Sequence, residues 1–459
     1  MSSPKADDSW GIAVVHAMRL AILSVFSLLF IPSLASTQDR DWPKFLGPLG
    51  TSVSTEKGII TPWPKEGLKI VWHKEVGTGY GMPTISNGKL YHFDRNGKNA
   101  RLTCMNVKTG APLWTYEYLS IYKDQYGYNN GPRCSPLIDA DLVYLYGVEG
   151  MIHCVKADTG KHVWDVNVNK EFNVIQNFFG VGSSPVIEGN LLIAQVGGSP
   201  DGSTPRDLFS QTLKGNGSGV VAFDKSTGKV AYKVSNELAS YSSPVLATIN
   251  GRRWCFLFAR GGLLGFDPAN GRLDFHFPFR ADDVESVNAS NPVVIGDQVF
   301  LSECYGPGST LLKVKPGGYE VLREESKKFK KNTQCHWMTP IYHDGYLYGS
   351  SGRHTPGADL RCIELATGKI MWSEKGLTRS SLLMVDGHFI CLSEDGALRL
   401  LKVNPQKYEE ISTLQLKEPR TGRSLLEYPC WAAPILSHGL LYVRGEERLV
   451  CLELIPRKK

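Results

Sequence analysis

A strong excess of charge of one sign is missing from this chain of 459 residues. Its 51 basic and 45 acidic side chains leave a formal net charge of +6. The densest basic run, KKFKK at 327–331, has no aromatic series interleaved with it. A nucleic-acid surface needs a concentrated basic patch, so we interpret this run as a solvated loop and predict no nucleic-acid partner.

Long hydrophobic runs are also scarce. One apolar segment, LAILSVFSLLFI at 20–31, follows Arg19 and precedes the small residues PSLAS. It is too short for a comfortable transmembrane span and is typical of a secretory signal peptide. We therefore predict a signal peptide over 1–35, a periplasmic or secreted protein, and no transmembrane anchor after cleavage. The start MSSPKADDSW is long and acidic for a signal peptide, so translation starts at either Met1 or Met18.

Repetition is what the chain has in abundance. The phrase VKTGAPLW (107–114) returns as ADTGKHVW (157–164), KSTGKVAY (225–232), PANGRLDF (268–275) and LATGKIMW (365–372). Each copy has a turn that ends in glycine and an aromatic residue four positions later. A phrase that recurs at such intervals indicates a repeat architecture. We predict that this aromatic residue is a structural peg on an outer strand, which packs one repeat against the next.

A second marker gives the number of repeats. Short apolar strands begin with a proline after a small residue or methionine, and each is followed by a turn and a second strand. The starts are Pro83, Pro136, Pro185, Pro244, Pro292, Pro340, Leu382 and Pro434. Four short strands per unit are typical of a propeller blade, and proline is tolerated at the first residue of a strand. The sequence predicts an all-β, eight-bladed β-propeller with four antiparallel strands per blade.

The last unit lacks its fourth strand, and the segment GLKIVWHKEV (67–76) has no partners of its own. Pairing the two closes the ring and removes exposed sheet edges. We therefore assign 67–459 to the propeller, closed by an N-terminal strand, and 36–66 to an extended lead-in over its surface. The outer strands of the fifth and seventh units carry no aromatic peg, which predicts weaker contacts there.

Ten cysteines in an exported chain would normally suggest disulfides. Four of them, however, occupy one repeat position, five residues before the threonine of the TG turn where that turn is present. Equivalent positions of different repeats lie too far apart for a disulfide bond. We predict that Cys104, Cys154, Cys362 and Cys451 are buried free thiols.

The repeat resembles the pyrroloquinoline-quinone-like (quinoprotein-type) β-propeller family, whose blades end in a TG-x-x-x-W phrase. The opening DWPKFLGP and the segment WPKEGLKIVWHKEVGTGYGMPTI resemble a secreted subgroup found in planctomycete-like bacteria. The wider family includes quinoprotein dehydrogenases, which bind the quinone with calcium. It also includes the scaffold propeller of the outer-membrane β-barrel assembly machine, which has no cofactor.

The sequence departs from the dehydrogenase pattern in several respects. It has no adjacent cysteine pair, no CxxCH motif for a covalent haem, and less length for added active-site segments. Fold alone does not determine function. We therefore expect no cofactor and no metal, and keep pyrroloquinoline quinone with calcium as the alternative.

Candidate binding residues come from the loops that lead into the inner strands. Three residues before each strand start lie Tyr80, Arg133, Gly182, Tyr241, Ala289, Trp337, Arg379 and Trp431. Six of the eight are aromatic or arginine, so they either stack a planar ligand or fill the mouth of the channel. An arginine between tryptophans also suits a carboxylate or phosphate. Glu303, His336 and Arg353 are expected in the same sector.

The predicted function is that of an exported, non-catalytic scaffold that binds a protein partner, a small molecule or a sugar at this loop face. The alternative is a quinone-dependent oxidoreductase acting on alcohols or sugars. Whether the chain is an enzyme stays open at this point.

Overall fold

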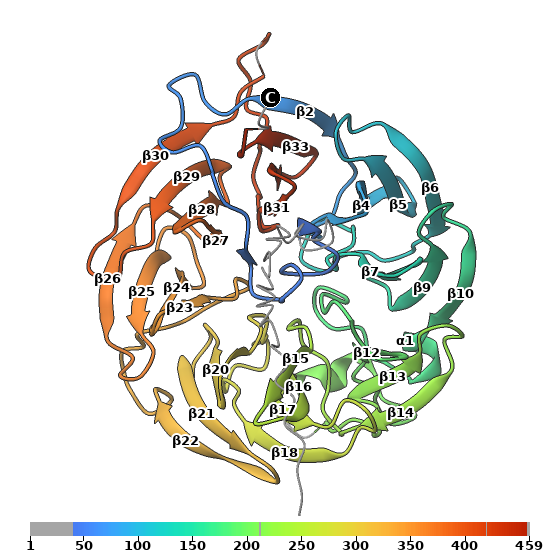
Figure 1. Cartoon of the computed structure of the whole chain (residues 1–459). Coiled ribbons are helices and arrows are strands. Elements are labelled where there is room, and N and C mark those ends of the chain that lie inside the picture. The colour runs from blue at the N-terminus through green and yellow to red at the C-terminus, as the bar shows by residue number, and fades with distance from the viewer. Residues whose placement is uncertain (1–39, 211–212, 419, 457–459) are drawn as a thin grey trace, which may run out of the picture. The chain divides into compact units, whose positions relative to one another are not determined.

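The structure, a computed structural model, describes residues 40–210, 213–418 and 420–456. Within these ranges the chain forms eight sheets arranged as blades around a central axis (Figure 1). The predicted all-β, eight-bladed propeller with four antiparallel strands per blade is confirmed. The predicted signal peptide over 1–35 lies outside the described residues.

Blades 1 to 4 follow one another along the chain. Blade 1 consists of β3 (Thr84–Ser86), β4 (Lys89–Asn96), β5 (Asn99–Asn106) and β6 (Pro112–Leu119). Blade 2 consists of β7 (Leu137–Asp139), β8 (Leu142–Tyr146), β9 (Met151–Lys156) and β10 (His162–Asn167), followed by the helix α1 (Val168–Glu171). Blade 3 consists of β11 (Val186–Glu188), β12 (Leu191–Gln195), β13 (Val220–Asp224) and β14 (Val230–Val234), with a 3₁₀ helix over Pro205–Phe209. Blade 4 consists of β15 (Val245–Ile249), β16 (Arg252–Phe258), β17 (Gly262–Phe266) and β18 (Leu273–Pro278).

Blades 5 to 8 complete the ring. Blade 5 consists of β19 (Val293–Ile295), β20 (Gln298–Ser302), β21 (Ser309–Lys315) and β22 (Gly318–Glu324). Blade 6 consists of β23 (Ile341–His343), β24 (Tyr346–Ser351), β25 (Asp359–Glu364) and β26 (Ile370–Lys375). Blade 7 consists of β27 (Ser380–Val385), β28 (His388–Ser393), β29 (Ala397–Lys402) and β30 (Glu410–Gln415). Blade 8 consists of β31 (Ile435–Ser437), β32 (Leu440–Arg444), β33 (Arg448–Glu453) and β2 (Ile70–Glu75).

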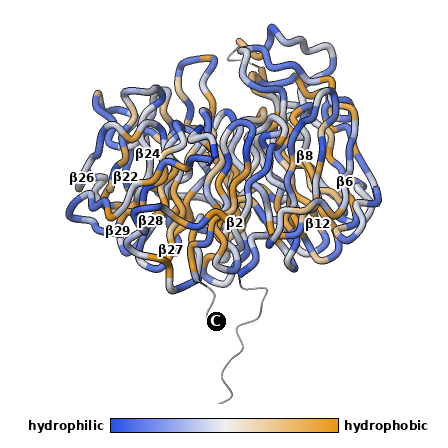
Figure 2. The backbone as a smooth tube through the Cα atoms, turned by 90° about the horizontal axis from the view of Figure 1, so that it is seen from above, coloured by the Kyte–Doolittle hydropathy of each residue, from blue (hydrophilic) through white to orange (hydrophobic). Residues whose placement is uncertain are grey.

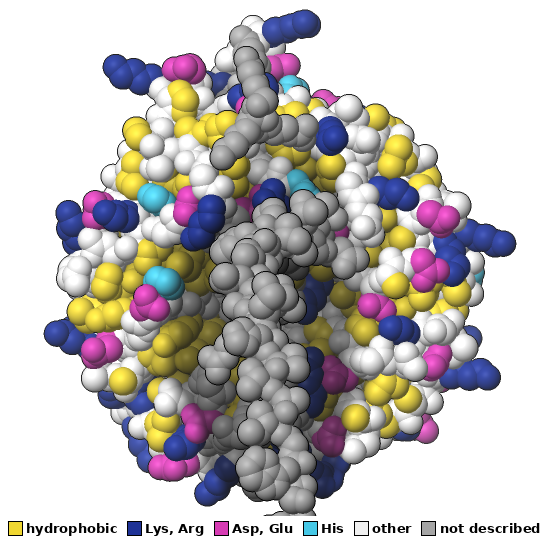
Figure 3. All heavy atoms as spheres, viewed as in Figure 1, with side chains coloured by type: hydrophobic (Ala, Val, Ile, Leu, Met, Phe, Trp, Pro, Cys, Tyr) yellow, Lys and Arg dark blue, Asp and Glu magenta, His cyan; other side chains and the backbone are white. Residues whose placement is uncertain are grey.

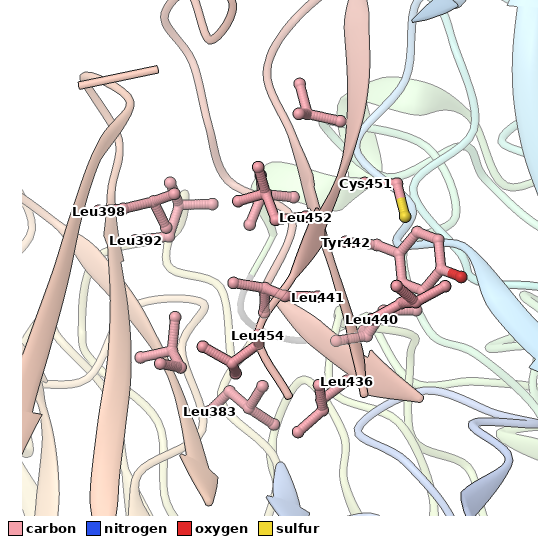
Figure 4. Close-up of a cluster of buried hydrophobic side chains, with 14 of the residues drawn as sticks. Leu383, Leu392, Leu398, Leu436, Leu440, Leu441, Tyr442, Cys451, Leu452 and Leu454 are labelled. Carbon is pink, nitrogen blue, oxygen red and sulfur yellow. The ribbon is translucent and has the colours of Figure 1, made fainter. Parts of the chain in front are cut away.

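Blade 8 closes the ring in the way the sequence predicts. Strand β2 pairs antiparallel with β33, and Trp72 lies opposite Cys451. The leucines of β31–β33 pack against those of β27–β29, as Figure 4 shows for Leu441 and Leu383 among others. A side view shows apolar residues along the strands and polar residues along the loops of both faces (Figure 2). On the face in Figure 3, basic and acidic side chains are interspersed around the rim.

The aromatic pegs hold consecutive blades together, as predicted. A Cβ atom at Gly160 would lie 2.5 Å from the ring of Trp114, so the tryptophan of blade 1 lies directly on the turn glycine of blade 2. The Trp164 indole N–H also donates to the carbonyl of Lys225 in blade 3 at 3.0 Å. Where the aromatic peg is missing, Arg323 and Leu414 lie in the corresponding contacts. The glycine of the turn is required because any side chain would displace the peg.

The cysteine alignment is confirmed by the register of the outer strands. Cys104 pairs with Trp114, Cys154 with Trp164, Cys362 with Trp372, and Cys451 with Trp72. All ten cysteines are buried and free. Each of these four thiols therefore fills space opposite a peg.

The lead-in lies over one end of the propeller, and several of its apolar side chains are buried against the blades. Trp42 and Leu46 have only 1% and 5% of their surface exposed, because large apolar side chains gain by leaving water. Trp42 forms an isolated antiparallel bridge with Ile85, and β1 (Val53–Ser54) pairs in parallel with β27. The segment thus lies across one end of the central channel, in blue at the middle of Figure 1.

Candidate functional site

A cavity of about 290 Å³ lies on the axis, and the loops that lead into the inner strands line it. Each of the eight blades contributes the residue predicted from its position three before the strand start. The eight are Tyr80, Arg133, Gly182, Tyr241, Ala289, Trp337, Arg379 and Trp431. Gly182 cannot be replaced by a larger residue without a steric clash, because a Cβ atom there would lie 2.9 Å from the ring of Tyr241. Phe45 of the lead-in also lines this cavity and an adjoining smaller one.

Aromatic rings form a continuous belt along the cavity wall. The centroids of Tyr241 and Phe179 lie 5.7 Å apart, and those of Phe179 and Tyr128 lie 5.6 Å apart. The belt continues from Tyr128 to Trp431 at 5.7 Å and from Trp431 to Trp337 at 5.3 Å. These spacings fall within the range of favourable aromatic pairs. The belt therefore presents a preformed apolar wall.

Arg379 lies in this wall between two indoles. Its guanidinium carbon is 4.5 Å from the ring centroid of Trp337 and 5.4 Å from that of Trp431. Its Nη2 donates to Glu394 at 2.7 Å, its Nε donates to the same carboxylate, and its Nη1 donates to the carbonyl of Arg353. The carboxylate expected from a ligand is thus supplied by the protein itself.

Glu394 is the residue around which this wall is organised. Its side chain is 2% exposed and also accepts hydrogen bonds from the Trp431 indole, at 2.9 Å, and from the Thr355 hydroxyl. Burial alone would raise the pKa of Glu394, but the bonds from Arg379, Thr355 and Trp431 outweigh it and lower the pKa. Glu394 therefore stays ionised and fixes Arg379 and Trp431 together.

Arg133, on the opposite side, is held in the same manner. Its Nη2 donates to the buried carboxylate of Asp124 at 2.7 Å, and its Nη1 donates to the carbonyl of Gly131 at 2.7 Å. The rings of Tyr80 and Tyr122 each lie 5.5 Å from its guanidinium carbon. Both arginines that line the cavity from the predicted ring are therefore charge-compensated.

The residues expected in the sector of blades 5 and 6 divide into two groups. His336 and Arg353 line the cavity, whereas Glu303 does not. Glu303 is 1% exposed and accepts backbone N–H groups of Tyr305 and Gly306, so it shapes the loop. Burial, followed by the charge of Arg379, lowers the pKa of His336 to about 3.

Arg353 differs from the other two arginines. Its side chain is 38% exposed and forms an ion pair of 3.7 Å with the half-exposed Asp283. Its guanidinium carbon lies 4.1 Å from the ring centroid of Tyr305. It therefore supplies the less firmly held positive charge at the wall.

Several contributors to the site were not predicted from the sequence, Val287 and Tyr305 among them. Phe45 belongs to the lead-in, and Tyr128 and Phe179 belong to the long connections before blades 2 and 3. Glu394 follows β28 and is positioned by pairing with Arg379: its N–H donates to the Arg379 carbonyl at 2.9 Å. The contact between this carboxylate and Arg379 is seen only in the structure, because the two residues are fifteen positions apart in the chain.

The lining does not fit a quinone held with calcium. Among the described residues, no aspartate or glutamate lines the cavity. Calcium requires six to eight oxygen ligands, several of them usually carboxylates. The nearby carboxylates of Glu394 and Asp124 are already bonded to arginines. The aromatic lining of the cavity suits an apolar ring, and among the residues that the structure describes it lacks the oxygen ligands that calcium needs.

Taken together, fold and cavity define an eight-bladed propeller with an aromatic pocket on its axis. The family model described as outer membrane protein assembly factor BamB matches residues 98–374, which is more than half of the chain. The chain belongs to this family, which confirms the resemblance to pyrroloquinoline-quinone-like propellers and their scaffold relative. A comparison with curated proteins finds no match.

Solved structures agree in fold. BamB from Moraxella catarrhalis superimposes with a TM-score of 0.55 at 13% identity, covering 85% of this chain and 99% of that one. The quinohemoprotein alcohol dehydrogenase from Comamonas testosteroni gives a TM-score of 0.63 at 11% identity, covering 92% and 82%. At these identities the likeness shows the shared fold alone. Within the described ranges, no helix has the length and hydrophobicity needed to span a bilayer.

Proposed function

We propose that this protein is an exported binding scaffold whose axial pocket accepts an aromatic side chain of a protein partner. The observation that carries the proposal is the belt of rings from Tyr241 to Trp337 around a cavity of about 290 Å³. Apolar concave sites with a few polar groups are the usual binding geometry. Membership of the BamB family supports a role in protein assembly over one in metabolism.

The polar groups of the pocket favour a peptide over a sugar or an anion. Arg379 and Arg133 are already paired with carboxylates, so they offer little to a ligand's negative charge. The Trp337 indole N–H and Nδ1 of His336 are buried without a partner among the described residues. An aromatic side chain with one hydrogen-bonding group matches these two polar atoms better than a sugar with many hydroxyls does. Hydroxyl groups that are buried without a hydrogen-bond partner are costly.

The rim extends the surface beyond the cavity. Tyr128 and Tyr428 are 51% and 59% exposed, and Tyr126 is 45% exposed. Aromatic residues clustered around a pocket are typical of interface centres. An extended peptide would therefore place one ring in the pocket and lie across these tyrosines.

Selection of phage-displayed random peptides on the purified protein tests this function. The selected peptides should be enriched in Phe, Tyr or Trp, and Trp337→Ala should weaken a selected peptide at least tenfold by calorimetry, about 1.4 kcal/mol. Trp372→Ala, which removes an outer peg, is the matched control and should leave the affinity unchanged. Peptides without aromatic residues, or equal binding by both variants, would contradict the proposal.

The alternative function, a quinone-dependent oxidoreductase, has a separate test. Adding pyrroloquinoline quinone and CaCl2 to the purified protein should give neither a bound chromophore nor dye-linked oxidation of alcohols or sugars. A bound chromophore with such activity would establish the alternative.

A further inference from the structure

Two histidines and an aspartate converge on the outer part of blade 2, far in sequence from the pocket wall of blades 6 to 8. His153 lies on β9, while His162 and Asp165 lie on β10. Residues three apart on a regular strand face opposite sides. Here the register shifts between His162 and Trp164, so His162 pairs with Val155 and Asp165 with His153. This β-bulge brings all three side chains to one face.

The ligating atoms are already close together. One ligand atom from each of the three residues lies within 4.8 Å of the other two. Nε2 of His162 is 2.8 Å from Oδ1 of Asp165. Both of these side chains are more than two-fifths exposed, so they can turn toward an ion without disturbing the core.

His153 gives the cluster its second, independent indication of a ligand. The residue is only 4% exposed, and its Nε2 has no hydrogen-bond partner among the described residues. Its Nδ1 lies 3.0 Å from the hydroxyl of Tyr116 in blade 1, and the centroids of the His153 and Tyr118 rings lie 4.0 Å apart. A ring nitrogen buried without a partner is costly, whereas a ligating histidine bonds through its second nitrogen in this way.

We propose that His153, His162 and Asp165 bind a divalent transition-metal ion of the zinc class. Two imidazoles and one carboxylate are a zinc ligand set, and they leave a fourth tetrahedral position for water. Calcium does not suit the set because it takes six to eight oxygen ligands. Tyr116 is a positioning residue that fixes this ring from the neighbouring blade.

Calorimetric titration of the untagged protein with ZnCl2 tests the site. The wild type should bind one equivalent of Zn2+ that His162→Ala and Asp165→Asn weaken at least tenfold. Both substitutions are at exposed positions, so the fold should persist, which circular dichroism checks. Tyr116→Phe should weaken zinc binding about tenfold through loss of the bond to Nδ1.

A matched control comes from another histidine–carboxylate pair. His276 lies 3.0 Å from Glu237 with no third ligand in the described cluster, so His276→Ala should bind zinc as the wild type does. CaCl2 should give no heat of specific binding. The proposal is overturned if the wild type binds no zinc or if His276→Ala abolishes the binding. It is also overturned if His162→Ala and Asp165→Asn bind zinc as tightly as the wild type does.

Discussion

Substitution of Glu394 by glutamine should loosen the pocket wall and destabilise the whole propeller. Arg379, whose side chain is 15% exposed, would lose the charge that compensates it. Removing one partner of a buried ion pair costs about 3 kcal/mol or more. For a domain of this size, a loss of about 3 kcal/mol corresponds to a fall in melting temperature of about 3 °C.

The pH dependence gives the same experiment a second readout. The pKa of Glu394 is lowered in the folded state, so its stabilisation is complete above the unfolded pKa of about 4.3 and is lost as the pH falls through the folded value. The difference in unfolding free energy between wild type and Glu394→Gln should therefore be full at pH 7 and shrink below about pH 4.

Urea unfolding followed by tryptophan fluorescence provides the assay, with two comparison variants. Adding Arg379→Met to Glu394→Gln removes both charges and should recover part of the loss. Asp283→Asn breaks the half-exposed pair with Arg353 and should cost less than about 1 kcal/mol. If Glu394→Gln has the same free energy of unfolding as the wild type, or if the double variant is less stable than Glu394→Gln, the wall is not organised by this carboxylate.

Four further predictions follow from the fold. Deletion of residues 40–76 should lower the melting temperature sharply, by as much as loss of a core element, and an unchanged curve would refute ring closure by β2. Gly160→Ala should be about 1–3 kcal/mol less stable than Gly189→Ala, since both have positive φ but only the first would push a Cβ against Trp114; equal stabilities would refute the packing. Thiol titration should find no reactive cysteine in the native protein and all ten in denaturant without reductant, whereas any disulfide would contradict the alignment. Burial lowers the pKa of His92 to about 3, so the free energy of unfolding should decrease as the pH falls from about 6.5 to about 3, because the unfolded chain takes up the proton first. His92→Asn should flatten this slope in pH-dependent unfolding, and an unchanged slope would count against it.

The repeat made the fold predictable, and its breaks mark where prediction failed. The strand starts recur once per blade and predict the blade number, and the unpaired segment 67–76 predicts the closure. The same periodicity predicts the eight residues, one from each blade, that line the axial cavity. The lead-in has no period, so the sequence does not predict that Trp42 and Leu46 are buried or what they pack against.

Non-repeating side chains explain the remaining gaps at the site. Glu394 meets Arg379 only through strand pairing across β27 and β28, and Tyr128 and Phe179 reach the axis from irregular connections. Glu303 is predicted at the pocket, but its carboxylate instead accepts hydrogen bonds from three backbone N–H groups of its own loop. Such choices depend on hydrogen-bond supply in three dimensions, which spacing does not encode.

The closing blade has a consequence for how the ring assembles. Trp72 and Cys451 meet across about 380 residues of chain, so bringing them together costs about 5 kcal/mol of loop entropy by the logarithmic rule. During synthesis, β2 emerges first and stays unpaired until β33 follows, while the intervening blades can form locally. Folding should therefore be slow in its final step, and the open ring, with unpaired strand edges, is the species most exposed to aggregation.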